Sequence, residues 1–238
     1  MDKAPQLCLP KRMARGLAIY DMDRTVTRRA TYTPFLIYAA RRLAPWRLFL
    51  TPVVVLLMMA YVAGLIDRGR LKELNYRLLV GRGVAPERLN AVIEQFADHQ
   101  LATNILPGAR TSIAADKADG RKLVLATASY RLYAAAIAHR LGFDDVIATE
   151  TQIDDQGWTI ERIDGENCYG AAKLAMIQAW LAREGLDRDA VHIRFYSDHI
   201  SDAPVHHWSD EAFATNPHDR LVRLAEVEGW KVLDWRKE

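Results

Sequence analysis

The chain has 238 residues, half of them hydrophobic and 26% charged, with a formal net charge of +2 at pH 7. This is an ordinary globular composition, with length for one α/β core and an insertion. A net charge so close to zero argues against a nucleic-acid partner. The two cysteines, Cys8 and Cys168, lack metal-ligand spacing, and a chain of this size needs no disulfide, so a reducing compartment is expected.

The first predicted element is a short buried strand at residues 17–20, which ends at Asp21. The apolar run is too short, and an acidic residue follows too soon, for the core of a signal peptide. We therefore expect a cytoplasmic location.

A helical region follows, from residue 31 to residue 103. Thr33 and Pro34 read as an N-cap and a first helical position. The predicted helices are one that ends near residue 43, an apolar stretch at 48–66, and amphipathic helices at 70–79 and 86–101.

After residue 106 the pattern alternates between strand and helix, which is typical of a parallel sheet with right-handed crossovers. Residues 151–160 read as a small hairpin. The further predicted strands are 122–126, 145–149, 192–196 and 212–215. The predicted fold is α/β, a Rossmann-like sheet built from residues 15–30 and 104–238, with a helical cap at residues 31–103.

Two pairs of acidic residues follow predicted strands. Asp21 and Asp23 come after the first strand, and Asp198 and Asp202 come after residues 192–196. The carboxyl ends of parallel strands meet at one edge of a sheet, so both pairs can reach one site. Carboxylate oxygens suit Mg²⁺, which keeps several of its waters. The alternative is that these acids are turn residues and helix caps.

A hydroxyl and an amine fit the same site. Thr127 ends a predicted strand and can donate a hydrogen bond to a phosphoryl oxygen. Lys173 lies at the start of a predicted helix, where free backbone N–H groups already favour anions. Taken singly, Thr127 reads as a strand-end residue and Lys173 as solvated surface.

In this order the four elements resemble the haloacid dehalogenase superfamily of phosphohydrolases. That family has Asp-x-Asp-x-Thr, then a Ser or Thr, then a Lys, then an Asp pair, and the resemblance spans residues 17–235. The helical insertion between the first two motifs, and Gly165-Glu166-Asn167-Cys168-Tyr169-Gly170 ahead of the lysine, are similar to subfamily IB, which includes phosphoserine phosphatase.

The resemblance implies a two-step phosphomonoester hydrolysis. Asp21 forms an aspartyl-phosphate, Asp23 acts as acid and then as base, and Thr127 and Lys173 hold the phosphoryl oxygens. Mg²⁺ is held by the Asp21 side chain, the Asp23 carbonyl and Asp198, with support from Asp202. The implied substrate contacts are Thr25, Ala128, Ser129 and Ser201.

Two departures concern the substrate. Phosphoserine phosphatase has Gly-Gly after its second-motif serine, where this chain has Ala128-Ser129 after Thr127. Its Gly-Asp-Gly-x-Asn-Asp is here Ser-Asp-His-Ile-Ser-Asp, so Ser201 replaces the asparagine. The chemistry survives these changes, and the substrate is left open.

The charge-free stretch at residues 48–66 is near the lower limit for a membrane span. A single crossing would separate Asp21 from the other motifs by a bilayer, so the stretch is buried, forms a homodimer, or dips into one leaflet. The insertion also resembles that of phosphatidylglycerophosphatase C-type enzymes, which points to a lipid phosphate. The cations expected to meet anionic headgroups are Arg41, Arg42, Arg47, Arg68, Arg70 and Lys72.

Three classes of function stay open from the sequence. They are a phosphatase for a small phosphate ester, a phosphatase at a membrane surface, and a binding module that keeps the fold without catalysis. Phosphotransfer to an alcohol instead of water uses the same residues.

Overall fold

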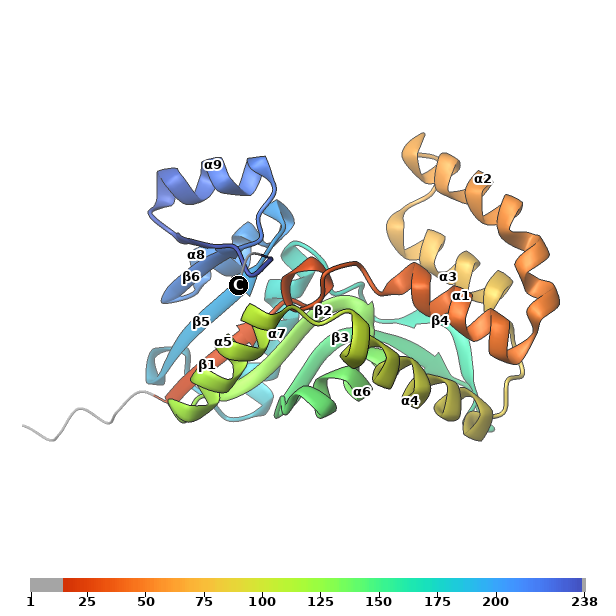
Figure 1. Ribbon diagram of the computed structural model, residues 1–238, viewed down its shortest axis with the longest axis horizontal. Coiled ribbons are helices and arrows are strands. Elements are labelled where there is room, and N and C mark those ends of the chain that lie inside the picture. The colour runs from red at the N-terminus through yellow and green to blue at the C-terminus, as the bar shows by residue number, and fades with distance from the viewer. Residues whose placement is uncertain (1–14, 237–238) are drawn as a thin grey trace, which may run out of the picture.

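The computed structural model describes residues 15–236, so Cys8 lies outside the described residues. Its sheet has the strand order β4-β3-β2-β1-β5-β6-β7 (Figure 1). All neighbouring strands are parallel except β3 and β4, which form the hairpin expected near residues 151–160. The strands are β1 (Arg15–Tyr20), β2 (Lys122–Tyr130), β3 (Asp145–Ile153), β4 (Thr159–Asp164), β5 (Val191–Ser197), β6 (Glu211–Thr215) and β7 (Lys231–Leu233). The predicted α/β class is confirmed.

Helices cover both faces of the sheet because successive residues of β1 point to opposite sides. Ala18 and Tyr20 pack toward α5 (Pro107–Ala118) and α6 (Arg131–Leu141). Leu17 and Ile19 pack toward the opposite face. The helices there are α7 (Ala171–Arg183) and α8 (Ala203–Trp208), while α9 (Asp219–Glu228) packs on β6. Short 3-10 turns lie at Arg188–Ala190 and Ile200–Asp202. Both faces of the central strands are therefore buried, as in other parallel sheets.

The region of residues 31–103, between β1 and α5, is helical and lies to one side of the sheet (Figure 1). Its elements are α1 (Tyr32–Leu43), the 3-10 helix η2 (Pro45–Leu50), α2 (Thr51–Val62), α3 (Arg68–Leu79) and α4 (Pro86–Thr103). We call this region the cap. The outermost cap helix is α2, and α3 and α4 contact the core at β4 and α6.

Two cap boundaries differ from the expectation. Helix α1 begins at Tyr32 with Thr31 at the N-cap, because the carboxylate of Asp23 accepts hydrogen bonds from the Thr31 N–H and hydroxyl. The apolar stretch is not one helix. A 3-10 turn precedes α2, and α2 ends before Gly64, whose φ of 74° is a left-handed conformation typical of helix ends.

An aromatic cluster joins the cap to the core. Phe35 of α1 stacks on Tyr133 of α6 with ring centroids 4.4 Å apart, and it meets the edge of Phe96 of α4 at 5.3 Å. All three side chains are fully buried or nearly so. The relative position of cap and core thus depends on close-packed rings, which tolerate loss of volume poorly.

We expect Phe35→Ala to lower the free energy of unfolding by about 3–5 kcal/mol, because it leaves a cavity at this joint. Urea denaturation followed by circular dichroism measures the change. Val227→Ala is a matched control at an exposed position and should stay within about 0.5 kcal/mol of the parent. A loss below about 1 kcal/mol for Phe35→Ala would contradict this packing.

Candidate active site

The register of the sheet brings the first and last motifs together. In the pairing of β1 with β5, Tyr20 lies opposite Tyr196, and the N–H of Asp21 donates to the carbonyl of Tyr196 at 2.8 Å. The hydroxyl of Thr25 donates to Asp21 Oδ2 at 3.2 Å and accepts from the N–H of Asp198 at 3.0 Å. Asp21 and Asp198 therefore leave the sheet at the same edge.

The turn after Asp21 has an unusual backbone. Arg24 has a φ of 65°, a left-handed conformation that is uncommon outside glycine. The side-chain amide of Asn216 donates to the carbonyl oxygens of Arg24 at 3.0 Å and Thr25 at 3.3 Å. Strained turns of this kind are found at functional sites, where the surrounding structure holds them.

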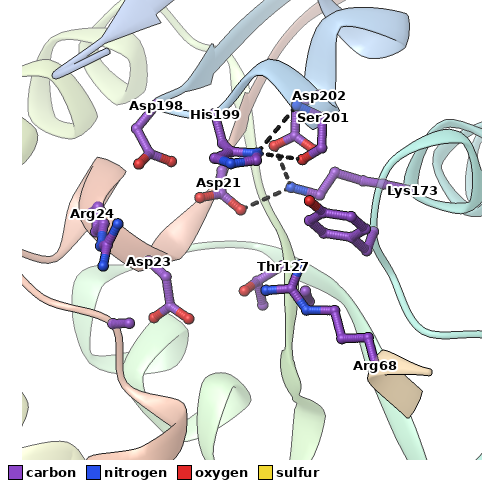
Figure 2. A pocket seen from close by; sticks show the side chains of 13 residues that line it. Asp21, Asp23, Arg24, Arg68, Thr127, Lys173, Asp198, His199, Ser201 and Asp202 are labelled. Carbon is purple, nitrogen blue, oxygen red and sulfur yellow. Dashed lines mark hydrogen bonds and ion pairs between the residues drawn. The ribbon is translucent and has the colours of Figure 1, made fainter. Parts of the chain in front are cut away.

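Lys173 lies buried between two acids. Its Nζ is 2.8 Å from Asp21 Oδ1 and 2.6 Å from Asp202 Oδ2 (Figure 2). Asp202 Oδ2 also accepts from the hydroxyl of Ser197 at 2.6 Å. Burial alone would lower the pKa of Lys173, but Asp202 and Asp21 raise it above its ordinary value. The lysine is therefore a fixed positive charge at neutral pH.

The negative charge of the site exceeds what Lys173 balances. Burial, then the proximity of Asp21 and Asp202, raises the pKa of Asp198 well above its ordinary value. Burial likewise raises the pKa of Asp21, against the opposing effect of Lys173. The oxygen Oδ1 of Asp202 is buried and finds no hydrogen-bond partner among residues 15–236. Crowded carboxylates and an unpartnered oxygen fit a site for a divalent cation.

Few protein side chains are available to hold a metal ion at this site. Among residues 15–236, no three His, Cys, Asp or Glu side chains converge closely enough to hold a metal ion by themselves. The side chain of Asp23 bonds Thr31 and Ser129, and its backbone carbonyl is the group expected to bind Mg²⁺. Such a site suits Mg²⁺, which takes few protein ligands and keeps waters.

Asp23 is held by the first residue of the cap and by the second motif. Its Oδ1 accepts from the N–H of Thr31 at 2.9 Å and from the Thr31 hydroxyl at 2.8 Å. Its Oδ2 accepts from the hydroxyl of Ser129 at 3.0 Å. Burial raises the pKa of Asp23 even though these hydrogen bonds oppose the rise. A raised pKa favours the protonated form that a general acid needs.

The acids surround a pocket of about 230 Å³. Most of the residues expected at the site line it: Asp21, Asp23, Thr127, Ala128, Lys173, Asp198, Ser201 and Asp202. Thr25 and Ser129, expected to bind substrate, are not among the lining residues. Both are buried, and their hydroxyls bond Asp21 and Asp23 respectively. They hold the acids in place without facing the pocket.

The sequence reasoning missed five pocket residues: Arg24, Ala30, Arg68, Tyr169 and His199. Arg24 and His199 lie inside the recognised motifs and could have been proposed on that ground. Arg68 comes from the cap, and its guanidinium carbon lies 4.1 Å from the ring centroid of Tyr169. No sequence signal pairs Arg68 with Tyr169, because the two are brought together only when the cap meets the core.

One cation expected to face membrane headgroups lies elsewhere, because Lys72 is buried with 6% of its surface exposed. The expectation was wrong for Lys72, since α3 turns back from α2 and carries this side chain into the joint between cap and core. Arg68 is exposed and lines the pocket, and Arg47 donates to the carbonyl oxygens of Arg77 and Leu78, at 3.1 and 2.9 Å.

Comparison with known proteins agrees with this geometry. The haloacid dehalogenase-like hydrolase family matches residues 18–207, which is most of the chain. The chain belongs to this family. The match to the haloacid dehalogenase-like hydrolases includes all four motifs, from Asp21 to Asp202.

Individual relatives extend the comparison. Phosphoserine phosphatase SerB1 of Mycobacterium tuberculosis is 33% identical over 168 residues, which are 71% of this chain and 52% of that protein. The chain thus spans about half the length of this curated relative. A protein of unknown function from Bordetella pertussis has a TM-score of 0.84 at 26% identity, covering 93% of this chain and 99% of its own. A phosphoserine phosphatase solved as a phospho-aspartyl intermediate analogue shares the fold, with a TM-score of 0.60 at 16% identity over 93% of this chain and 94% of its own.

In this hydrolase, Lys173→Met should lower the free energy of unfolding at pH 7 by about 3–5 kcal/mol, because two buried carboxylates lose their counter-charge. The pKa of Asp21 then rises further, so the folded variant binds protons more readily than the unfolded chain. The deficit should shrink as the pH falls from 7 to 5.

Urea unfolding with chelator present, at both pH values, measures this deficit. Lys122→Met is the control, because Lys122 has an equally short ion pair with Glu184 (2.6 Å) at the surface. Lys122→Met should lower the free energy of unfolding by at most about 1 kcal/mol. A deficit for Lys173→Met that is unchanged or larger at pH 5 would rule out the proposed charge balance.

Proposed function

We propose that this chain is a Mg²⁺-dependent phosphomonoester hydrolase that acts through an aspartyl-phosphate on Asp21. The observation that carries the proposal is the convergence of Asp21, Asp23, Thr127, Lys173 and Asp198 on one pocket. These residues come from segments up to 177 positions apart (198 minus 21). Such a gathering of acids, a hydroxyl and an amine is the arrangement that phosphoryl transfer requires.

In the first step, a carboxylate oxygen of Asp21 attacks phosphorus while the ester P–O bond breaks. Lys173 and Thr25 hold the two oxygens of Asp21, at 2.8 and 3.2 Å, and so fix the direction of attack. The leaving oxygen takes a proton from Asp23, whose raised pKa keeps that proton available. The products of this step are the free alcohol and an aspartyl-phosphate.

In the second step, Asp23 acts as a carboxylate and removes a proton from water. The water oxygen bonds to phosphorus, the bond from phosphorus to Asp21 breaks, and inorganic phosphate leaves. Thr127 and Lys173 are placed to hold the phosphoryl oxygens through both steps. Attack by an alcohol in place of water would make the same chain a phosphotransferase.

The residues that would hold Mg²⁺ are the side chains of Asp21 and Asp198 and the carbonyl of Asp23, with Asp202 in support. When bound, the cation neutralises charge between the carboxylate and the phosphate. Without the positive charge of the cation, the excess negative charge of the pocket would repel a phosphate dianion. The cap, residues 31–103, closes one wall of the site through Arg68 and would select the substrate.

Asp21→Asn should reduce hydrolysis of p-nitrophenyl phosphate at least about 1,000-fold, because an amide cannot form the intermediate. Turnover is measured with Mg²⁺ and with chelator, and chelator should abolish the parent activity. Asp155→Asn in the exposed hairpin turn is the control and should keep full activity. Persistent turnover by Asp21→Asn, with circular dichroism unchanged, would refute the mechanism. An inactive parent would leave the non-catalytic binding module as the better interpretation.

The substrate class we favour is a small or amphiphilic phosphate ester. The amphiphilic candidate rests on the segment Pro45–Val62, which is long and apolar enough to cross a membrane. Only Val54 is buried within it. Its exposed large apolar side chains are Trp46, Phe49, Val53, Val55, Leu56, Met58, Met59, Tyr61 and Val62. An exposed apolar area of this size marks an interaction surface.

The connections of this segment oppose a single crossing. Both of its ends lead into cap helices, and α1 and α3 are tied together by the hydroxyl of Tyr32, which donates to the carbonyl of Lys72 at 2.8 Å. A crossing would pull these helices apart. We therefore propose peripheral contact, in which η2 and α2 enter one leaflet and the cytoplasmic enzyme works on a lipid phosphate of the phosphatidylglycerophosphate type. A homodimer that covers the same side chains is the alternative.

The enzyme should sediment with vesicles of phosphatidylglycerol, and Phe49→Ser with Val62→Ser should reduce the bound fraction several-fold. The two side chains are 87% and 84% exposed. A matched control combines Ile153→Ser with Val227→Ser, which are 66% and 81% exposed outside the segment. The control should sediment like the parent. A parent that stays in solution as a dimer would favour the homodimer instead.

A further inference from the structure

Lys72 is a buried lysine that the mechanism does not use. Its side chain comes from α3 of the cap and is 6% exposed. Within residues 15–236 no carboxylate lies at ion-pair distance from its amine, which bonds only neutral oxygens. Burial, together with the nearby Arg68, lowers the pKa of Lys72 to about 7, although Asp23 and Cys168 oppose this. A charge buried at such cost needs compensation from its surroundings.

Three oxygen atoms from the core provide that compensation. Nζ donates to the carbonyl of Ala128 at 2.6 Å, to Oδ1 of Asn167 at 2.8 Å and to the hydroxyl of Thr149 at 3.4 Å. An ammonium has three donors, so all of them are used. The amine also lies 4.5 Å from the ring centroid of Tyr130, a cation–π contact. We call these partners, which come from β2, β3 and the loop before α7, the Lys72 socket.

The carbonyl that Lys72 holds lies between two functional hydroxyls. Ala128 separates Thr127, which lines the pocket, from Ser129. The Ser129 N–H donates to Thr127 Oγ1 at 3.1 Å, and the Ser129 hydroxyl donates to Asp23 at 3.0 Å. Fixing the Ala128 carbonyl therefore fixes the irregular end of β2 that orients both Thr127 and the proposed acid.

Lys72 also links the loop before the lysine motif to Arg68, the cap residue that lines the pocket. Asn167 lies six residues before Lys173, in the loop that leads into α7. Arg68 is one helical turn before Lys72 on α3, so the two share a face of the helix. Seating Lys72 in its socket thus holds Arg68 at the pocket wall.

We infer that Lys72 is a positioning residue, through which the cap sets Thr127, Ala128 and Ser129 at the end of β2 and thereby the placement of Asp23. This rests on the proposed phosphatase function and adds to it a contribution from the cap that no motif contains. The core alone, on this inference, holds its second motif less well than the core with α3 in place.

Other contacts hold the cap against the core. Arg140 of α6 pairs with Glu94 and Asp98 of α4, at 2.7 Å in each case. Arg82 pairs with Glu161 of the β4 hairpin. Neither pair lies in the pocket, so Arg140→Met removes a joint between cap and core without touching the site. It is therefore the matched control for Lys72→Met.

The test compares hydrolysis of p-nitrophenyl phosphate with Mg²⁺ by the parent, Lys72→Met and Arg140→Met. Lys72→Met should lower kcat about 10- to 100-fold, the usual effect of misplacing a catalytic group by about 1 Å, with KM changed less than about threefold. Arg140→Met should keep kcat within about twofold. An unchanged kcat for Lys72→Met, or an equal loss in Arg140→Met, would overturn the inference.

A double-mutant cycle separates positioning from general loosening. If Lys72 acts through Ser129 and Asp23, the fold-loss from Lys72→Met should shrink at least about threefold in a Ser129→Ala background. Full additivity would contradict this route. If Lys72→Met does not fold, Thr149→Val removes one partner of the amine at constant shape, and it should lower kcat in the same direction. The activity of the parent tests the proposed function separately. An inactive parent would refute the phosphatase function but would leave the contacts of Lys72 unchanged.

Discussion

The concentration of negative charge at the carboxyl edge of β1 and β5 is the constraint on which the rest of the structure depends. The parallel register of these strands places Asp21 and Asp198 side by side, and Asp202 follows within one turn. Burial, followed by the repulsion between neighbouring carboxylates, raises the pKa values of Asp21 and Asp198. Lys173 offsets part of the repulsion, and the remaining negative charge is what fits the divalent cation that we propose for the site.

The cap acts on this charged edge from outside the sheet. Thr31, its first residue, holds one oxygen of Asp23, while Arg68 and Lys72 reach the pocket and the end of β2 from α3. Helix α2 lies on the other side of the cap (Figure 1), and its large apolar side chains are exposed. Helix α3 therefore connects this apolar surface with groups that touch the second motif. An amphiphilic substrate held at a membrane surface would meet both.

The sequence was a good guide wherever a signal is local. Apolar runs followed by acids located β1 and β5, and proline followed by an amphipathic pattern located α4. Boundaries were less well predicted where a distant partner decides them. Helix α1 begins at Tyr32 because Asp23 binds Thr31. The strand predicted at 145–149 runs without a break into the hairpin predicted at 151–160, so that β3 extends to Ile153. The contact between Asp23 and Thr31 cannot be read from the segment itself, since it forms only when the chain has folded.

The sequence by itself determined the family and the residues that bear charge and hydroxyl groups, because the order and spacing of four motifs are properties of the chain. It could not determine which of those residues face the pocket. Thr25 and Ser129 turned inward to hold acids, whereas Arg68 was brought in from the cap. Lys72 shows the limit most clearly: a lysine in an amphipathic helix reads as surface, and only the meeting of α3 with β2 supplies the oxygens that let it be buried. Burial is decided by what packs against a residue, and that is a property of the tertiary structure alone.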